Sequence, residues 1–215
     1  MSNFVDIHTH HTSPDENNVI SVGNIRLGIG SPTAEAPLYS AGIHPWNVDS
    51  VNDCESIISQ LNHIDCAAIG EIGLDKYTSS PWNKQIEIFE RQLAIAQDRQ
   101  LPVIIHCVRA WSEVCNILSR HNLRAVIFHG FRGSLAQAQA LVELGYYISF
   151  GPKSFATPKH IEAFRWCPLD RIFFESDDTA MAITTVYETA ATIKSIEIEK
   201  LKDIIEANFK QIFQI

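Results

Sequence analysis

Residues 67–75 read AAIGEIGLD, a run of small and apolar residues that contains Glu71 and closes on Asp75. Its Ala and Ile content is typical of a strand buried on both faces, as the strands of parallel sheets are. Similar short runs recur along the chain, and many of them end in His, Glu or Asp. The expected strands are Phe4–His8, Val19–Ile25, Leu38–His44, Ala67–Glu71, Pro102–Cys107, Ala125–His129, Tyr146–Phe150 and Arg171–Ser176.

Segments with helical spacing follow several of these runs. The clearest is Pro81–Arg99, where Ser80 can cap the N-terminus and apolar residues recur at 3-4-3 spacing. Further helices are expected around Trp111–Arg120, over Ser134–Leu144 and from about Glu197 onward. This order predicts one α/β domain over residues 1–215, a (β/α)8 TIM barrel trimmed in its first βα units. The alternative is an open doubly wound sheet.

Composition narrows the class of protein. The chain has 215 residues, 46% of them hydrophobic, which suffices for one domain with a core. A net charge of −8 excludes a broad basic face for a nucleic-acid duplex, so an anionic substrate must be attracted locally. No apolar stretch approaches the roughly 18 residues of a membrane span, and the five cysteines include no CxxC pair. We expect a cytoplasmic protein with no membrane association and no obligate protein partner.

Metal-binding and acid–base side chains stand where most of the expected strands end. In a parallel barrel these ends form the mouth of the active site. The side chains are His8, His10, His44, Glu71, Asp75, His106, His129, Glu175 and Asp177. His8 and His10 are two residues apart and point the same way, which suits joint coordination of a metal. Alone, such a pair can simply cap backbone groups, but matching side chains on other strands favour a metal site.

The donor types indicate which metals fit. The candidate ligands are four imidazoles and two carboxylates: His8, His10, His106, His129, Glu71 and Asp177. This set is too rich in nitrogen for calcium and too poor in sulfur for iron–sulfur or structural zinc. Zn, Mn, Mg, Ni and Fe are compatible. Six ligands exceed the three of a mononuclear catalytic zinc site, so two ions about 3.5 to 4 Å apart, with one bridging carboxylate, are expected. Such a site is locally cationic and favours a phosphate ester.

Seven motifs together carry a family resemblance. They are FVDIHTH, AGIHP, AAIGEIGLD, VIIHC, FHGFRG, YYISFG and FFESD, in that order, between residues 4 and 177. In order and spacing they resemble the TatD family of metal-dependent deoxyribonucleases, which belong to the amidohydrolase-like barrels. The resemblance implies a hydrolase that cleaves DNA phosphodiester bonds with two divalent ions, Mg, Mn or Zn.

The resemblance also implies roles for single residues. It places His8, His10 and Asp177 on one metal, His106 and His129 on the other, and Glu71 between the two. A metal-activated water then attacks the phosphodiester phosphorus, with Asp177 orienting it and accepting its proton. Catalytic roles therefore fall to Asp177 and Glu71.

Each residue that could contact the substrate has a second interpretation. The resemblance makes His44 a contact to the substrate phosphate, and Arg109 is a candidate phosphate clamp; the alternatives are a loop His and a surface Arg. Asp6 either hydrogen-bonds a metal ligand or caps local backbone. Three tryptophans near strand-to-helix loops either stack bases or pack in the core or at its rim: Trp46, Trp82 and Trp111.

Departures from the family pattern affect substrate selection. Val108 stands where the family usually has Arg, with Arg109 one position later, and Asp178-Thr179-Ala180 replaces a small residue and Pro. The Gly/Arg/Asn/Pro-bearing loop that normally follows is missing, and the segment after His10 is shortened. Two other functions are therefore kept open. One is a metal-dependent hydrolase of a small phosphate ester or amide; the other is a binding protein without turnover, against which Glu71 and Asp177 argue.

Overall fold

The computed structural model describes residues 2–11, 18–29, 36–49 and 54–214. All eight expected strands are present within these ranges. They are β1 (Phe4–Thr9), β2 (Val19–Arg26), β3 (Leu38–Gly42), β4 (Ala68–Asp75), β5 (Val103–Val108), β6 (Val126–Phe128), β7 (Tyr147–Phe150) and β8 (Ile172–Phe174).

The strands follow one another in sequence order in a single sheet, β1 to β8. The pairs β1–β2, β3–β4, β4–β5, β6–β7 and β7–β8 are parallel. The segment after β8 returns to the end of β1 through a parallel bridge between Thr9 and Asp177. Sequential order with this return is the topology of a (β/α)8 barrel, which confirms the expected fold class. A doubly wound sheet would reverse its strand order at a switch point.

Helices follow most of the strands. They are α1 (Cys54–Leu61), α2 (Trp82–Arg99), α3 (Trp111–Leu118), α4 (Leu135–Glu143), α5 (Pro158–Trp166), α6 (Ile183–Lys194) and α7 (Ile198–Phe213). Three short 3-10 turns complete the set: η1 (Pro45–Asn47), η2 (Pro152–Phe155) and η3 (Leu169–Arg171). No helix lies in the described parts of the β1–β2 and β2–β3 connections, as expected for trimmed units, whereas α1, α5 and α6 lie outside the expected set.

The expected cap of α2 is wrong. Pro81 occupies the N-cap position, and no side chain caps the helix there. Ser80 instead donates its hydroxyl to the carbonyl of Trp46, 3.2 Å away. The hydroxyl therefore fixes the chain that leaves β3. Gly145 ends α4, with φ +79° and its amide donating to the carbonyl of Val142.

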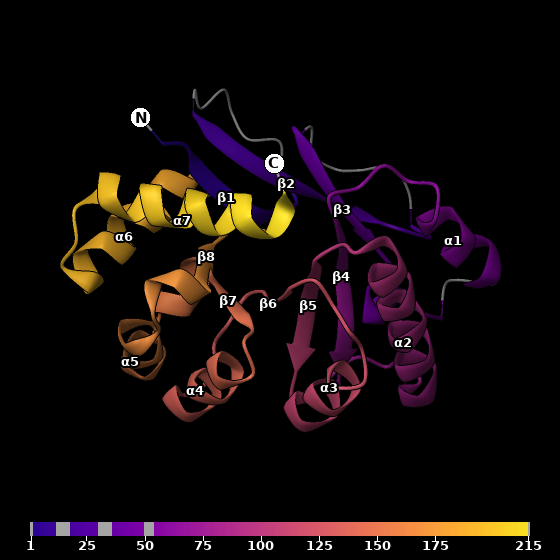
Figure 1. Ribbon diagram of the computed structural model, residues 1–215. Helices are drawn as coiled ribbons and strands as arrows, with labels where there is room; N and C mark the ends of the chain where they lie inside the picture. The colour runs from indigo at the N-terminus through magenta and orange to yellow at the C-terminus, as the bar shows by residue number, and fades with distance from the viewer. Residues whose placement is uncertain (1, 12–17, 30–35, 50–53, 215) are drawn as a thin grey trace. The chain divides into compact units, whose positions relative to one another are not determined.

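The chain divides into two compact units. The terminal unit comprises residues 1–23, 33–38 and 127–215, and the middle unit comprises 24–32 and 39–126. Helices α4 to α7 pack against β1, β7 and β8 in the first (Figure 1), and α1 to α3 accompany β4 and β5 in the second. That residues 1–215 form one domain stays a prediction.

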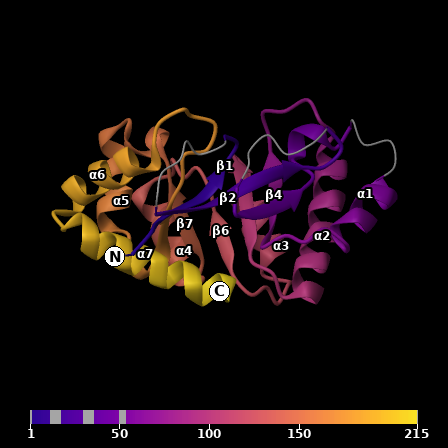
Figure 2. The same cartoon turned by 90° about the horizontal axis from the view of Figure 1, so that it is seen from above.

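Helix α7 anchors the beginning of the chain within the terminal unit. Asn3 donates its backbone and side-chain N–H groups to Glu206, and Figure 2 shows α7 beside the start of β1. Asn208 donates its amide to the carbonyls of Leu169 and Ile172, which join α7 to the start of β8. Both edges of the β1–β8 seam are thus tied to one helix.

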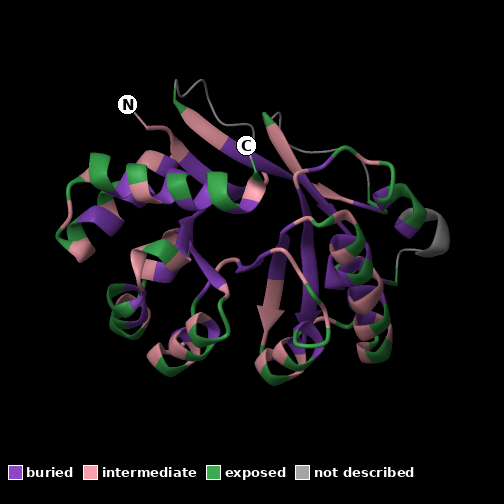
Figure 3. Cartoon of the chain, in the orientation of Figure 1, coloured by how far each residue is buried: buried purple, intermediate pink, exposed green. Residues whose placement is uncertain are grey.

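Most strand residues are buried, as Figure 3 shows. Strand β4 is buried along its whole length, including Glu71 and Asp75. Charged side chains survive such burial only where they are paired, so these acids mark a polar site inside an apolar frame. Every described helix is too short or too polar to cross a membrane.

Candidate metal centre

The seam between β1 and β8 brings three expected ligands together in the terminal unit. Backbone hydrogen bonds run from the Asp177 amide to the His8 carbonyl and from the His10 amide to the Asp177 carbonyl, both at 3.0 Å. Asp177 adopts φ +55°, a conformation that costs an L-residue energy and is held here by the seam. The backbone therefore fixes all three residues relative to one another.

These residues form the first ligand group (His8, His10 and Asp177). The two imidazole Nε2 atoms lie 3.2 Å apart, and Asp177 Oδ1 lies 3.9 Å from that of His8 and 3.8 Å from that of His10. A circle through three atoms with these separations has a radius of about 2.1 Å, the length of Zn–N and Zn–O bonds. The three donor atoms can therefore share one divalent ion, as their expected role requires.

Asp6 hydrogen-bonds to Ser176, the residue before Asp177, and so supports this group. Its carboxylate accepts from the Ser176 amide at 3.0 Å and from the Ser176 hydroxyl at 2.6 Å. Burial raises the pKa of Asp6 to about 7, although the bonds from Ser176 act to lower it. These contacts match the backbone-capping interpretation: Asp6 holds the segment that carries Asp177.

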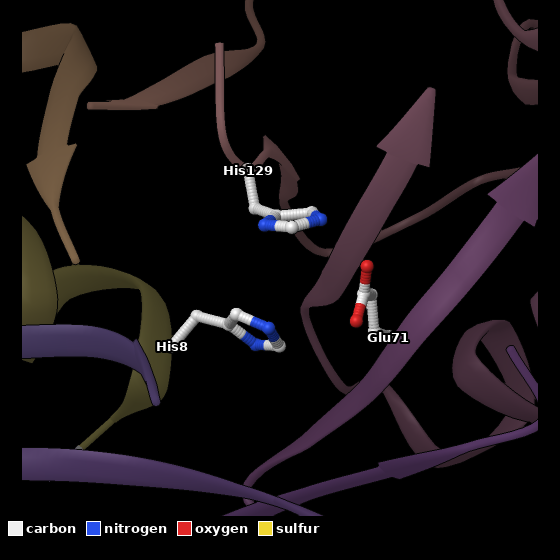
Figure 4. A group of neighbouring side chains, drawn as sticks. All are labelled: His8, Glu71 and His129. Atoms are coloured by element: carbon white, nitrogen blue, oxygen red, sulfur yellow. The ribbon is translucent and has the colours of Figure 1, made fainter. Parts of the chain in front are cut away.

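His129 lies beside His8 in the same unit. Their ring centroids are 4.6 Å apart, and Figure 4 shows the two imidazoles at close range. Glu175 stands behind His129, with its Oε1 3.5 Å from His129 Nδ1 and 2.7 Å from the Gly130 amide. Burial acts to raise the pKa of Glu175, but its contacts with His129 lower it. A carboxylate on one ring nitrogen orients a histidine so that the other nitrogen can bind a metal.

Glu175 is among the side chains expected at the strand ends, but the sequence assigns it no role. The spacing of Glu175 and Asp177 indicates a shared site, because residues two apart at a strand end point to the same side. Glu175 is fully buried and adjacent to His129, so we assign it the role of holding the His129 ring in place.

The second ligand group (His44, Glu71 and His106) lies in the middle unit. Glu71 Oε1 is 3.1 Å from His44 Nε2 and 2.7 Å from His106 Nδ1, and Glu71 Oε2 is 3.4 Å from Arg26 Nη2. One carboxylate thus meets two imidazoles and a guanidinium. Arg26 is absent from the expected site because β2 shows no His or acid at its end.

Two strand boundaries around this group are wrong in the sequence prediction. Glu71 does not end β4, which continues to Asp75, and β3 ends at Gly42, before His44. The pairing of β4 with β5 shifts register between Ile69 and Ile72. Such irregularities redirect a side chain, which explains how a mid-strand Glu71 projects from β4 toward His44 and His106.

His44 is held as a neutral hydrogen-bond donor. Its Nδ1 accepts from the Trp46 amide at 3.2 Å, so the proton lies on Nε2, which faces Glu71. Burial lowers the pKa of His44 to about 4. The side chain is fully buried, and its expected contact with a substrate phosphate stays a prediction.

Asp75 contacts both His106 and the exposed residue Trp46 in the middle unit. Its Oδ2 lies 3.1 Å from His106 Nε2 and accepts from the Trp46 indole at 2.6 Å. Burial acts to raise the pKa of Asp75, but hydrogen bonds from His106, Trp46 and Tyr77 lower it to about 2. The carboxylate is therefore ionised at neutral pH.

Two buried glutamines of α2 hold the backbone of this group. Gln92 exchanges hydrogen bonds with the amide and carbonyl of Ile43, and Gln85 does the same with Asp75. Both side chains are almost fully buried. The helix thereby fixes the chain at His44 and at Asp75.

Arg109 lies at the surface, with its guanidinium 4.8 Å from the centre of the Tyr77 ring. Its role as a phosphate clamp stays a prediction. Burial raises the pKa of the neighbouring Cys107 to about 12, so this thiol is protonated at neutral pH and unsuited to metal binding.

The structure therefore brings His8, His10 and Asp177 together and sets His129 beside them, while Glu71 meets His106 and His44. The donor sets of both groups, imidazole and carboxylate, suit Zn, Mn or Mg. The expected pairing of His106 with His129, and the bridging role of Glu71, join residues of different units and stay predictions.

Comparisons with known proteins agree with this chemistry. The family described as "TatD related DNase" matches residues 32–214. "Uncharacterized metal-dependent hydrolase YabD" of Bacillus subtilis is 32% identical over 199 residues, covering 83% of this chain and 78% of that protein. "Uncharacterized metal-dependent hydrolase YjjV" of Escherichia coli is 31% identical over 215 residues, covering 84% and 81%.

Solved structures share the fold. The crystal structure of the TatD homologue YJJV from Escherichia coli superposes with a TM-score of 0.83 at 22% identity, covering 99% of this chain and 98% of that one. A TatD family hydrolase from Entamoeba histolytica gives 0.79 at 15% identity, covering 98% of each chain.

Proposed function

Because the chain belongs to the TatD family of metal-dependent hydrolases, we propose that it cleaves phosphodiester bonds of DNA with two divalent metal ions. The first ligand group carries this proposal, since its three donor atoms fit one ion and include a carboxylate. DNA ends and single strands are the expected substrates, because no broad basic face is available for a duplex.

The ligand sets follow the expected roles. His8, His10 and Asp177 would hold one ion, and His106 and His129 the other, with Glu71 shared between them. Bound there, divalent ions lower the pKa of water and neutralise charge on the phosphate oxygens.

The chain's own residues then guide the reaction. Asp177 is 23% exposed, so its carboxylate is open to the attacking water, orients it and takes its proton. The water oxygen bonds to phosphorus while the bond from phosphorus to the 3′ oxygen breaks. Glu175 keeps His129 in one orientation, and Asp75 does the same for His106. His44 and Arg109 are the proposed phosphate contacts.

Nucleotide release from a single-stranded DNA oligonucleotide, with Mg²⁺ or Mn²⁺, tests the proposal. Metal-dependent release by the wild type is expected, with loss in Glu71→Ala. Glu87→Ala, an exposed acid on α2, is the matched control and should keep full activity. Release that persists in Glu71→Ala would point to a contaminating nuclease and contradict the proposal.

The net charge of −8 favours a second candidate, a hydrolase of a small phosphate ester or amide. Turnover of 4-nitrophenyl phosphate without release from oligonucleotides would select it. For the location of the protein we propose the cytoplasm, because the four cysteines that the structure describes are all free thiols: Cys66, Cys107, Cys115 and Cys167.

A further inference from the structure

A hollow of about 250 Å³ opens in the middle unit beside the second ligand group. It is lined by Trp46, Asp75, Tyr77 and Thr78. Trp46 is 51% exposed and Tyr77 is 67% exposed. Two large aromatic side chains at the rim of one hollow are unusual for a surface that only faces water, and they are typical of ligand recognition.

Asp75 holds both aromatic residues in place. Its Oδ2 accepts from the indole N–H of Trp46 at 2.6 Å, and its Oδ1 accepts from the amide of Tyr77 at 2.7 Å. The backbone of Asp75 is in turn fixed by Gln85. The exposed Trp46 ring is therefore tethered, and the backbone that carries the Tyr77 ring is fixed, so less conformational entropy is lost when a ligand stacks there.

Contacts behind Trp46 tie it to the ligand group. Its ring centroid is 4.7 Å from that of His44 and 5.8 Å from that of His106, both in edge-to-face geometry. Trp82 and Trp111, the other two tryptophans weighed as stacking residues, are half-buried. Among these three, Trp46 alone combines high exposure with a direct link to an expected metal ligand.

Positive charge accompanies the aromatic rings. The guanidinium of Arg26 lies 5.8 Å from the Trp46 ring centroid, and that of Arg109 lies 4.8 Å from the Tyr77 ring centroid. Each aromatic ring thus has a cation that can meet a phosphate. A base flanked by phosphates is the ligand with both features.

We propose that Trp46 and Tyr77 form a stacking site for one nucleobase next to His106, with Asp75 as the residue that positions them. This rests on the proposed function, because it makes the substrate a nucleotide strand. The volume is below the roughly 300 to 1,000 Å³ of pockets for drug-sized ligands, which suits one base rather than a whole nucleotide.

Binding of two sugar phosphates, one with a base and one without, tests the site without relying on activity. The probes are deoxyadenosine 5′-monophosphate and 2-deoxyribose 5-phosphate, measured by calorimetry on the full chain. The wild type should bind the nucleotide more tightly. Tyr77→Ala should weaken nucleotide binding by about 5-fold to 150-fold, the range for one lost stacking contact, and leave sugar-phosphate binding unchanged.

Further variants separate stacking from folding. Tyr77→Phe keeps the ring and should restore nucleotide affinity, and Trp46→Ala should lower it as Tyr77→Ala does. Trp166→Ala is the matched control, because Trp166 lies on α5 in the terminal unit and is 40% exposed. Equal wild-type affinity for both probes, or equal loss in Trp166→Ala and Tyr77→Ala, would overturn the proposal.

Oligonucleotides with one abasic position separate this proposal from the nuclease function. If the enzyme cleaves normal and abasic strands with the same KM, the nuclease function stands and the base site fails. If no strand is cleaved but the nucleotide still binds more tightly than the sugar phosphate, the base site stands and the nuclease function fails.

Discussion

The two ligand groups contain the same side-chain types, two imidazoles and one carboxylate each, and hold them differently. In the first, Asp177 Oδ1 lies 3.8 and 3.9 Å from the imidazole nitrogens, beyond hydrogen-bond distance. In the second, Glu71 Oε1 lies 2.7 and 3.1 Å from them. Asp177 is 23% exposed and Glu71 only 3%.

From this difference we expect the two groups to have different tasks. The spacing of the first group suits a shared cation and its exposure admits water, so it should govern the attack on phosphorus. The second group is a buried hydrogen-bond network, in which a missing partner would leave polar atoms unsatisfied. It should therefore respond to changes in protonation through stability as well as through activity.

The largest expected effect concerns the first group. Asp177→Asn keeps the shape of the side chain and removes its ability to accept a proton. We expect kcat to fall by about 100-fold to 10,000-fold, the contribution of a positioned base. Steady-state kinetics on the oligonucleotide measures this, with circular dichroism to verify the fold. A decrease of less than 10-fold would remove Asp177 from the role of base.

The second group predicts a pH dependence of stability. Burial lowers the pKa of His44 from 6.5 to about 4, so between these values the unfolded chain binds a proton that the folded chain does not. Stability present above pH 6.5 is then lost as pH falls toward 4, by about 3 kcal/mol in the metal-free protein. Urea unfolding of EDTA-treated protein at several pH values measures it.

His44→Gln provides the control for this pH effect. Glutamine can still donate a hydrogen bond to Glu71 and does not titrate. The pH slope is the change in the free energy of unfolding per pH unit. The part of this slope that His44 contributes should therefore disappear between pH 6.5 and 4. An identical slope in the variant and the wild type would show that His44 is not the responsible group.

A smaller effect is expected from Glu175, which supports His129 beside the first group. Glu175→Gln should lower metal affinity by about 10-fold to 100-fold, as is usual when the partner of a metal-binding histidine is changed. Competition with a fluorescent chelator gives the affinity. Asp178→Asn, an exposed acid paired with Lys153, is the matched control and should leave metal affinity unchanged. Similar losses in both variants would indicate a general charge effect.

The smallest effect belongs to Arg26. Its contact with Glu71 is 3.4 Å long and its side chain is 28% exposed, so the ion pair is partly screened by water. Arg26→Gln should change the free energy of unfolding by less than about 1 kcal/mol. A loss of several kcal/mol in urea unfolding would make Arg26 an essential member of the second group.

The fold could be predicted because each strand repeats one simple pattern, a short apolar run before a polar residue. The helices α5 and α6 carried usable signals that this pattern did not capture. Thr157 caps α5 before Pro158, and α6 buries Ile183, Tyr187 and Ala191 at four-residue spacing. In α6 the many β-branched residues lower the helix propensity and obscure that spacing. The segment is helical because its apolar side packs in the structure.

The first ligand group was predictable for a different reason. Its three members lie at the ends of β1 and β8, which a closed parallel barrel makes neighbours. Glu175 and Asp75 were expected at the strand ends without a role, and Arg26 was not expected at all, because their roles depend on which ring nitrogen or carboxylate oxygen they contact. Such contacts follow from local backbone irregularities, such as the register shift around Glu71, that residue patterns do not specify.

Metal content per chain decides whether the first group binds one of two divalent ions. Wild type, His10→Ala and the control Glu87→Ala would be loaded with Zn²⁺ or Mn²⁺, freed of excess metal and analysed by mass spectrometry. We predict two ions per chain in the wild type and in Glu87→Ala, and one in His10→Ala. Equal content in His10→Ala and the wild type would contradict the claim.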